Sequence, residues 1–347
     1  MENIFIKKDI SIREAIKKID VTAKKILLVI EEEIIIGTVT DGDIRRWILK
    51  NGDLNFEVSN IMNASPVVLN LKERHLAKQY INDKSVLALP IVDDNNRVLD
   101  VVFGNEKYND EFHNYEPISN PVIIMAGGKG TRLYPYTKIL PKPLIPIGDI
   151  SITERIISKF VKFGCRNFFL TVNYKKNMIK AYFDELEKNY EISYVEEEEF
   201  LGTGGSLSLL KGKIKETFFV SNCDILVDAD YIDILKYHKR NNNLITMVTS
   251  LKNYKIPYGI IKLSNDGQII GTTEKPEYDY LVNAGFYVLE PETLVDVPEN
   301  TFFHITDLIN KYIKEGKKVG TYPITENSWL DMGEIKEMDR MIKKLEL

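Results

Sequence analysis

The chain has 347 residues, of which 44% are hydrophobic and 28% charged, a composition typical of a globular protein with two or three domains. Its net charge of −5 argues against non-specific binding to nucleic acid. No apolar run approaches the roughly 20 residues of a membrane helix. No signal peptide is apparent and there are only two cysteines, so we expect a cytoplasmic protein without a disulfide framework.

Residues 1 to about 115 contain an internal repeat with a period of roughly 60 residues. In the first copy, a strand at 4–6 precedes a helix with Ser11 and Glu14 as its capping box. Strands at 26–30 and 34–39 and a helix from near Asp43 to Lys50 follow. The second copy has strands at 67–69, 86–92 and 98–103, with a helix capped by Asn70 and Glu73. The pattern predicts two βαββα units.

This repeat resembles a pair of CBS motifs, regulatory modules that often bind adenine nucleotides. The segment Gly37–Asp43, GTVTDGD, is similar to the G-x-x-T-x-x-D of that family, in which the Thr meets phosphate and the Asp meets ribose hydroxyls. The resemblance implies that Thr40 and Asp43 bind an adenine nucleotide effector. The alternative is that both residues only cap a helix. The second copy has Phe103–Glu106 in place of the Thr and Asp, so we expect its site to be inactive.

CBS pairs commonly stack across two chains, which implies a homodimer or a higher homo-oligomer. A polar stretch at 109–121, with two prolines, then separates this region from the rest. We therefore expect a tandem CBS regulatory domain at 1–115, a linker at 116–120 and a catalytic domain at 121–347.

The catalytic part begins with an apolar strand at 122–126, followed by glycines and a stiff, proline-flanked segment around Lys142. Glycines let the backbone come close to a ligand, and successive N–H groups can converge on an anion. Arginine and lysine side chains then add fixed positive charge. A Walker loop does not fit the spacing, and Leu133 stands where a dinucleotide fingerprint needs its third glycine.

The same stretch resembles the signature of sugar-nucleotide pyrophosphorylases, A-G-G-x-G-T-R-L-x-P followed by P-K-P, almost letter for letter. The resemblance implies that the loop binds the nucleotide and that Arg132 and Lys142 are catalytic. The nucleotide-binding loop residues are Ala126, Gly127, Gly128, Gly130 and Thr131.

From residue 121 on, apolar strands alternate with amphipathic helices, which predicts an α/β fold with a Rossmann-like, mainly parallel sheet covered by helices on both faces. The resemblance implies that this nucleotidyltransferase domain is GT-A-like. A hairpin is expected at 260–263 and 268–271, joined by the turn at 265–267.

Two aspartates lie in motifs that match the pyrophosphorylase family. Asp224 follows the strand at 218–221, with Cys223 replacing a small residue, and Asp331 lies in WLDMG, similar to the W-x-D-x-G of the family. The resemblance implies that Asp224 and Asp331 hold Mg²⁺, which accepts few protein ligands, and that Asp224 is catalytic. Taken alone, either aspartate could be a helix cap or turn residue.

The segment LGTGGS at 201–206 resembles the L-G-T-A-G-A with which the family cradles the base and ribose, which implies that Gly202 and Thr203 bind nucleotide. Glu199 could accept the N1–H and N2–H₂ donors of guanine, which uracil and thymine lack as a pair. The alternative is that the acidic run 196–199 is a solvated turn.

Three further segments resemble the sugar side of the family: Y-G, E-K-P and N-x-G-x-Y. They imply sugar-binding roles for Tyr258, Gly259, Glu274, Lys275 and Asn283.

These patterns predict an enzyme that condenses a nucleoside triphosphate with a sugar 1-phosphate, releasing pyrophosphate. The combination with a CBS pair resembles the glucosamine-1-phosphate guanylyltransferases of bacterial nonulosonic acid pathways such as that of legionaminic acid, which implies GTP and glucosamine 1-phosphate. The alternatives are a UTP- or dTTP-dependent glucose-1-phosphate enzyme and an inactive nucleotide-sensing CBS protein. We expect no nucleic acid or membrane partner.

Overall fold

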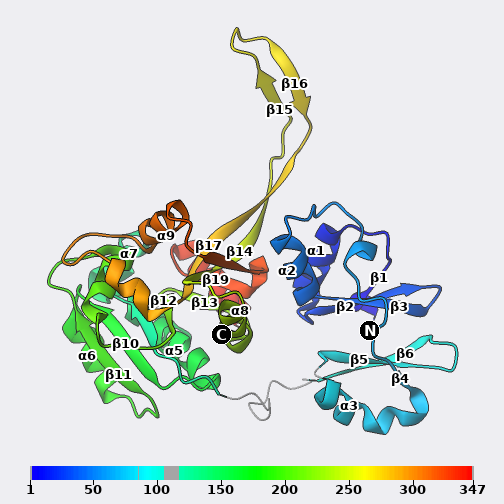
Figure 1. Cartoon of the computed structure of the whole chain (residues 1–347), viewed down its shortest axis with the longest axis horizontal. Helices are drawn as coiled ribbons and strands as arrows, with labels where there is room; N and C mark the ends of the chain where they lie inside the picture. Colours follow the sequence, from blue (N-terminus) through cyan, green and yellow to red (C-terminus); the bar gives the residue numbers. More distant parts are fainter. Residues whose placement is uncertain (1, 85, 105–116, 346–347) are drawn as a thin grey trace. The chain divides into compact units, whose positions relative to one another are not determined.

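The structure, a computed structural model, describes residues 2–84, 86–104 and 117–345. The chain divides into two compact units, Met1–Phe112 and His113–Leu347 (Figure 1). The boundary expected at residues 115 and 116 lies outside the described residues, as do Asn105 and Glu106 of the second repeat. None of the helices in the described ranges has the length and apolar character needed to cross a membrane.

The first half of unit 1 is a three-stranded sheet with two helices. The sheet has the order β1 (Phe5–Ile6), β2 (Ile26–Glu31) and β3 (Ile34–Thr40), and the helices are α1 (Ile12–Thr22) and α2 (Asp41–Leu49). The predicted capping box of Ser11 and Glu14 is present. The helix α1 buries the apolar face that its 3.6-residue period predicts, formed by Ile12, Ala15, Ile16 and Ile19.

The second half of unit 1 repeats the order strand, helix, strand, strand. It contains β4 (Leu69–Asn70), α3 (Ala77–Lys84), β5 (Ala88–Val92) and β6 (Val98–Phe103). The predicted cap at Asn70 starts a 3₁₀ helix, η3 (Leu71–Leu76), and the α-helix begins only after it. The Asn70 side chain accepts from the N–H of Lys72, two residues on, which fits this tighter turn.

Unit 2 is built on a seven-stranded sheet in the order β11-β10-β7-β12-β17-β14-β18. Among the strands of this sheet, only β17 runs antiparallel to its neighbours, so the predicted mainly parallel sheet is confirmed. The strands are β7 (Val122–Met125), β10 (Asn167–Val172), β11 (Glu191–Glu196), β12 (Phe218–Asn222), β14 (Ile245–Lys255), β17 (Glu277–Leu289) and β18 (Val319–Ile324).

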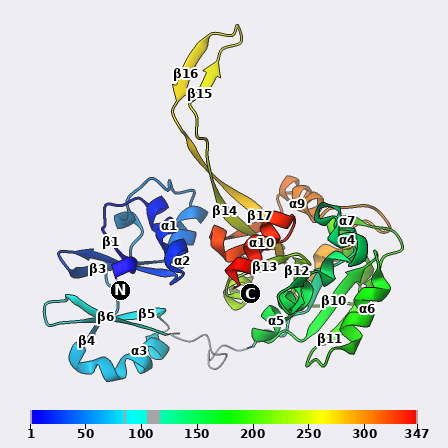
Figure 2. The ribbon, with the colours of Figure 1, turned by 180° about the vertical axis from the view of Figure 1, so that it is seen from behind.

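Helices and short helical turns cover both faces of this sheet, as Figure 2 shows. The central strand β7 alternates, with Val122 and Ile124 in one apolar cluster and Ile123 and Met125 in the other. The first cluster is completed by α5 (Ile152–Lys162), α6 (Lys176–Glu185), α8 (Tyr231–Arg240) and α10 (Ile335–Lys344). The second is completed by α9 (Ile305–Lys314), η6 (Ser206–Leu210) and η7 (Pro291–Asp296).

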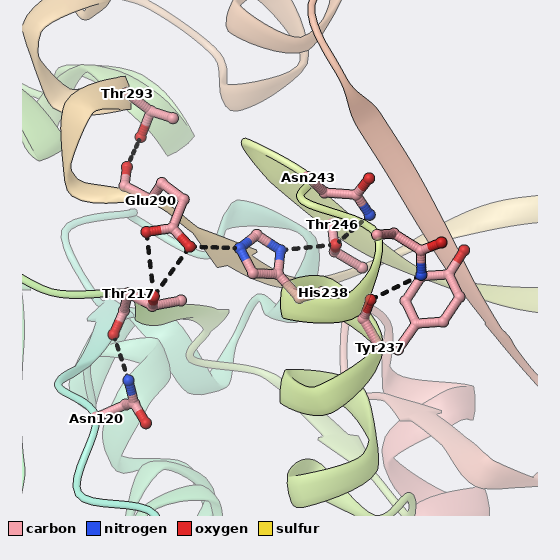
Figure 3. Close-up of polar contacts among 9 residues, drawn as sticks. Asn120, Thr217, Tyr237, His238, Asn243, Thr246, Glu290 and Thr293 are labelled. Atoms are coloured by element: carbon pink, nitrogen blue, oxygen red, sulfur yellow. Dashed lines mark hydrogen bonds and ion pairs between the residues drawn. The ribbon is translucent and has the colours of Figure 1, made fainter.

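A buried polar network lies at the amino-terminal edge of the parallel strands (Figure 3). The His238 ring, from α8, lies 2.8 Å from Thr246 Oγ1 through Nδ1 and 3.1 Å from Glu290 Oε1 through Nε2. Thr217 Oγ1 also donates to Glu290, at 3.0 Å, and the Thr217 carbonyl accepts from Asn120 Nδ2 at 2.7 Å. The network therefore joins the segment before β7 to the beginnings of β12 and β14.

The described part of the expected linker, residues 117–120, has neither helix nor strand but contacts unit 2. Ile118 belongs to an apolar cluster of that unit, and its N–H donates to the carbonyl of Phe163 at 3.0 Å. Asn120 is buried in the network of Figure 3. The chain is thus already fixed in unit 2 several residues before β7 begins.

The strands β14 and β17 lead into a long hairpin formed by β15 (Ile260–Leu263) and β16 (Ile269–Thr273). Both views show this hairpin projecting away from the sheet (Figures 1 and 2). The hairpin was predicted from the turn at 265–267, but its projection was not.

Candidate active site

The loop after β7 needs its glycines for two different contacts. A Cβ atom on Gly127 would lie 2.5 Å from Glu197 Oε1, closer than real Cβ contacts allow. Gly130 has φ +64°, in the left-handed region, and a Cβ there would lie 2.9 Å from the Cβ of Lys142. The loop is therefore packed against an acidic residue on one side and the Lys142 segment on the other. Thr131 and Arg132, in η4 (Thr131–Leu133), are exposed beside it.

Lys142 begins the 3₁₀ helix η5 (Lys142–Leu144), and its ammonium forms an ion pair with Asp224 Oδ2. The two side chains are only 13% and 9% exposed. Burial lowers the pKa of Lys142, but the nearby charges, led by Asp224, outweigh this effect and the pKa is raised overall. The lysine is therefore a fixed positive charge at the carboxyl edge of the sheet.

A short strand pair brings the two predicted aspartates together. In it, β13 (Ile225–Val227) pairs antiparallel with β19 (Trp329–Asp331), with Ile225 opposite Asp331. The N–H of Met332 donates to the carbonyl of Asp224 at 2.8 Å. Burial, followed by the negative charge of Asp224, raises the pKa of Asp331, while Lys142 and Arg132 oppose this shift. The sequence indicated both aspartates, but neither of these strands was predicted.

The donor set at this position suits a hard divalent cation. It consists of two carboxylates, whose mutual repulsion a divalent ion would relieve. Within residues 2–84, 86–104 and 117–345 there is no group of three or more His, Cys, Asp or Glu side chains that could hold a metal alone. Such an ion would therefore take its remaining ligands from phosphate oxygens and water, as Mg²⁺ does.

Burial disfavours the reactive thiolate form of the neighbouring cysteine. Cys223 is buried, and burial together with the charge of Asp224 raises the pKa of its thiol to about 12. A thiol with this pKa stays protonated and unreactive at neutral pH.

Two glutamates of the acidic run 196–199 differ in their exposure to solvent. Glu199, predicted to read the base, is exposed. Glu197 is instead buried, and its carboxylate lies against Gly127 and accepts from the N–H of Leu201 at 3.0 Å. Burial raises the pKa of this carboxyl group, while hydrogen bonds from Leu201 and Thr171 oppose the shift.

Sequence reasoning missed Glu197, although a signal was present. Side chains of a strand alternate between faces, so Glu197, two positions after the apolar residue Val195, could have been placed on the same buried face. The run of four glutamates concealed this alternation.

The glycines of the segment 202–205, which forms α7 (Gly202–Gly205), pack against protein. The N–H groups of Gly204 and Gly205 donate to the carbonyl of Phe303 at 2.9 and 3.0 Å. Gly202 has φ +82°, and a Cβ there would lie 2.7 Å from the same carbonyl. These glycines therefore admit the segment around Phe303, and nucleotide binding by Gly202 and Thr203 stays a prediction.

Thr203 and His304 lie at the edge of this contact. Thr203 Oγ1 is 3.3 Å from His304 Nδ1, so the hydroxyl predicted to bind nucleotide has a protein partner. No sequence pattern indicated His304, because the contact joins residues about a hundred positions apart.

The predicted sugar-binding residues fall into two places. A Cβ atom on Gly259 would lie 2.8 Å from Glu274 Oε2, so the Y-G and E-K-P segments are neighbours at the base of the β15–β16 hairpin. Tyr258, Glu274 and Lys275 are exposed there, and Lys275 has φ +43°. The β15–β16 hairpin beyond them projects from the sheet (Figures 1 and 2).

Asn283 lies apart from that group, on β17 in the sheet. Its Oδ1 accepts from the N–H of Gly285 at 2.9 Å, and its Nδ2 donates to Tyr287 Oη at 2.7 Å. Gly285 in turn lies against Asn222, at the end of β12 and two residues before Asp224. Asn283 therefore lies on the strand that pairs with β12, whose end leads to Asp224.

In unit 1, Thr40 and Asp43 form a reciprocal capping box at the start of α2. Thr40 Oγ1 donates to Asp43 Oδ2 at 2.6 Å, and the N–H of Thr40 donates to the same oxygen at 2.8 Å. Arg46 pairs with the other carboxylate oxygen. Both residues therefore cap the helix, and ligand binding by them stays a prediction.

Comparisons with known proteins agree with this architecture. A family model described as "Nucleotidyl transferase" matches residues 121–346, and one described as "CBS domain" matches residues 1–50. The solved structure of HddC from Yersinia pseudotuberculosis is similar in fold, with a TM-score of 0.52 and 22% identity over 65% of this chain and 99% of that one.

Curated relatives match the same part of the chain. "Bifunctional protein GlmU" of Methanococcus maripaludis is 35% identical over 221 residues, which are 61% of this chain and 51% of that protein. "Mannose-1-phosphate guanyltransferase" of Pichia angusta is 32% identical over 62% of this chain and 61% of that protein. The chain thus spans about half the length of the first of these relatives.

The family match covers more than half of the chain, and the mainly parallel sheet, the glycine loop and the paired aspartates lie within it. The chain therefore belongs to the nucleotidyl transferase family and carries a CBS domain at its N-terminus.

Proposed function

We propose that the protein transfers a nucleoside monophosphate from a nucleoside triphosphate to a sugar 1-phosphate, releasing pyrophosphate and forming a nucleotide sugar. The observation that carries this proposal is the cluster at the carboxyl edge of the sheet. There, the Lys142–Asp224 ion pair, Asp331 and Arg132 interact beside a glycine loop. Ligands of open α/β sheets bind at this edge.

In the proposed reaction an oxygen of the sugar phosphate attacks the α-phosphorus. The bond from the α-phosphorus to the oxygen bridging to the β-phosphorus breaks, and pyrophosphate leaves with the electron pair. Arg132 holds the leaving pyrophosphate and Lys142 neutralises charge near the α-phosphate. This chemistry needs positioning and charge neutralisation rather than a protein nucleophile.

Asp224 and Asp331 are the proposed ligands of Mg²⁺, and enzymes of this family generally use a divalent metal. When bound, the ion would neutralise phosphate charge and act as a Lewis acid. The two carboxylates would hold the ion, and Asp224 already pairs with the ammonium of Lys142, so the site carries both signs of charge before substrate arrives.

We propose GTP as the donor, with Glu197 rather than Glu199 reading the base. A carboxylate that is buried against Gly127 can accept the paired N1–H and N2–H₂ donors of guanine, whereas Glu199 is exposed. The loop residues Ala126, Gly127, Gly128, Gly130 and Thr131 and the segment with Gly202 and Thr203 complete the proposed nucleotide site. Relatives named as mannose-1-phosphate guanylyltransferases support the choice of guanine.

Glucosamine 1-phosphate is the proposed acceptor, as in the guanylyltransferases of nonulosonic acid pathways, including that of legionaminic acid. Asn283 is the proposed sugar contact within the sheet. Tyr258, Gly259, Glu274 and Lys275, at the base of the hairpin, are the other proposed sugar contacts. Mannose 1-phosphate is the second candidate, supported by the names of two relatives.

We further propose that residues 1–115 form a regulatory CBS pair. An adenine nucleotide would bind at Thr40 and Asp43, and the pair would join copies of the chain into a homo-oligomer. The second half of unit 1 supports this, since it repeats the strand order of the first outside the matched residues 1–50.

One experiment tests the catalytic proposal. GTP, ATP, UTP and dTTP are each incubated with glucosamine, mannose or glucose 1-phosphate and Mg²⁺, and pyrophosphate release is followed. We expect GTP to be the best donor. If pyrophosphate were released fastest with a different triphosphate, that triphosphate would be the donor and the choice of GTP would be wrong. No release with any pair would contradict nucleotidyl transfer to these sugars.

A further inference from the structure

Two exposed phenylalanines stand beside the glycine loop, and nothing in the proposed reaction so far uses them. Phe200 and Phe302 are 44% and 57% exposed, although large aromatic side chains usually bury most of their surface. Their rings are in edge contact, with centroids 5.9 Å apart and planes at 61°. The ring of His304 packs edge-on against Phe302, with centroids 4.8 Å apart.

The protein backbone holds this aromatic group in place. The N–H of Phe303 donates to the carbonyl of Leu201 at 2.9 Å, and the carbonyl of Phe303 accepts from Gly204 and Gly205. These bonds fix the two chain segments that carry Phe200 and Phe302 side by side. The rings are therefore preorganised, and binding a ligand would not require ordering of either segment.

The aromatic group also has a defined position relative to the loop. The Cε2 atom of Phe200 lies 4.0 Å from the position of a Cβ on Gly128, while the Glu197 carboxylate lies against the adjacent Gly127. The Glu197 carboxylate, which can accept hydrogen bonds from the edge of a base, thus lies beside Gly127. The aromatic rings, which can cover the face of the same base, lie beside the next residue, Gly128. Planar bases stack on such rings, and every base has a π-face.

We propose that Phe200 and Phe302 form an aromatic wall on which the purine base of the nucleotide stacks while Glu197 reads its edge. The inference rests on the proposed function, because it names a further binding element of the same site. The wall contributes affinity for the base and has no part in the transfer at the α-phosphorus. His304 supports the wall through its contact with Phe302.

The test separates base binding from phosphate binding by calorimetry in the presence of Mg²⁺. GTP is one probe, and inorganic tripolyphosphate, which has phosphates but no base, is the other. Stacking removed by alanine substitution weakens binding by roughly 5- to 150-fold per base. We expect Phe200→Ala and Phe302→Ala to weaken the binding of GTP by a factor in this range and to leave the binding of tripolyphosphate unchanged. Phe302→Tyr, which keeps the ring, should bind GTP as the native chain does.

Two further measurements exclude a merely structural effect. Ile313→Ala removes another exposed apolar side chain, on α9, and should change neither affinity. In turnover, KM for GTP should rise while kcat stays within about threefold, since uniform binding is lost.

Unchanged GTP affinity in both alanine variants would overturn the wall, as would equal weakening of GTP and tripolyphosphate. If the alanine variants changed the molecular mass of the protein assembly but not its affinity for GTP, the two rings would belong to a protein interface, and the aromatic wall would also be overturned. Failure of the proposed function is distinct, because it appears in the native chain as the absence of binding by any triphosphate.

Discussion

Replacing Lys142 with methionine tests the charge balance on which the site depends. The substitution keeps much of the side-chain volume and removes the charge that pairs with Asp224. Removing one partner from a buried ion pair costs about 3–5 kcal/mol, since the other charge is left uncompensated. Both side chains are nearly buried, at 13% and 9% exposed, and Asp331 adds a second negative charge nearby.

We therefore expect Lys142→Met to destabilise unit 2 by about 3 kcal/mol, which corresponds to a fall in Tm of about 6–12 °C for a unit of its size. Millimolar Mg²⁺ should recover part of this loss, because an ion that binds only the folded state stabilises it. The recovery should exceed any effect of Mg²⁺ on the native chain, in which the ammonium already neutralises Asp224. The assay is thermal unfolding with EDTA or with Mg²⁺.

The matched control is Lys211→Met. Lys211 pairs with Glu299 at 3.1 Å, but the two side chains are 29% and 71% exposed. Exposed pairs contribute at most about 1 kcal/mol. If Lys142→Met cost no more than this control, or if Mg²⁺ had no effect on it, the reasoning about paired carboxylates would be refuted.

Three further predictions concern single residues. Arg132→Ala should lower kcat/KM for pyrophosphate release by about 100-fold or more, and full activity would contradict its role. Glu197→Gln should lower the preference for GTP over UTP by about tenfold or more, since hydrogen bonds to a charged group contribute about 1.5–3 kcal/mol; Glu199→Gln is the control and should keep the preference. Burial, only partly opposed by Glu290, lowers the pKa of His238 in the folded state, so the unfolded chain binds more protons below about pH 6.5. The free energy of unfolding should therefore fall as the pH drops below that value, by up to about 1.4 kcal/mol per pH unit, and less steeply in His238→Gln. The free energy of unfolding is measured with urea at several pH values between 7 and 5, and an equal dependence on pH in the native chain and the variant would contradict this.

Local sequence patterns predicted the elements of this protein well where a helix or strand buries one face. The capping box at Ser11 and the strands β12 and β15 were all expected within a residue or two of their observed bounds. Hydrophobic period and cap chemistry act over a few residues, so they can be read without knowledge of the fold. The loop from Ala126 to Lys142 was likewise recognisable because its glycines and charges are consecutive.

The pairing of β13 with β19 was not predictable, because each strand is three residues long and its partner is about a hundred residues away. The direction of the hairpin whose base carries Tyr258 and Lys275 was not predictable either. Turn residues determine that a hairpin forms but not the direction in which it leaves the sheet.

The sequence by itself determined which chemical groups this protein possesses: a glycine loop, two cations and two carboxylates in recognisable order. Only the tertiary structure decided which of them meet. Burial placed Glu197 against Gly127 and left Glu199 exposed, the β13–β19 ladder joined Asp224 to Asp331, and the segment around Phe303 packed against the glycines of α7. Contacts between distant segments depend on the packing of the whole sheet, and that packing cannot be predicted from a short segment of the sequence.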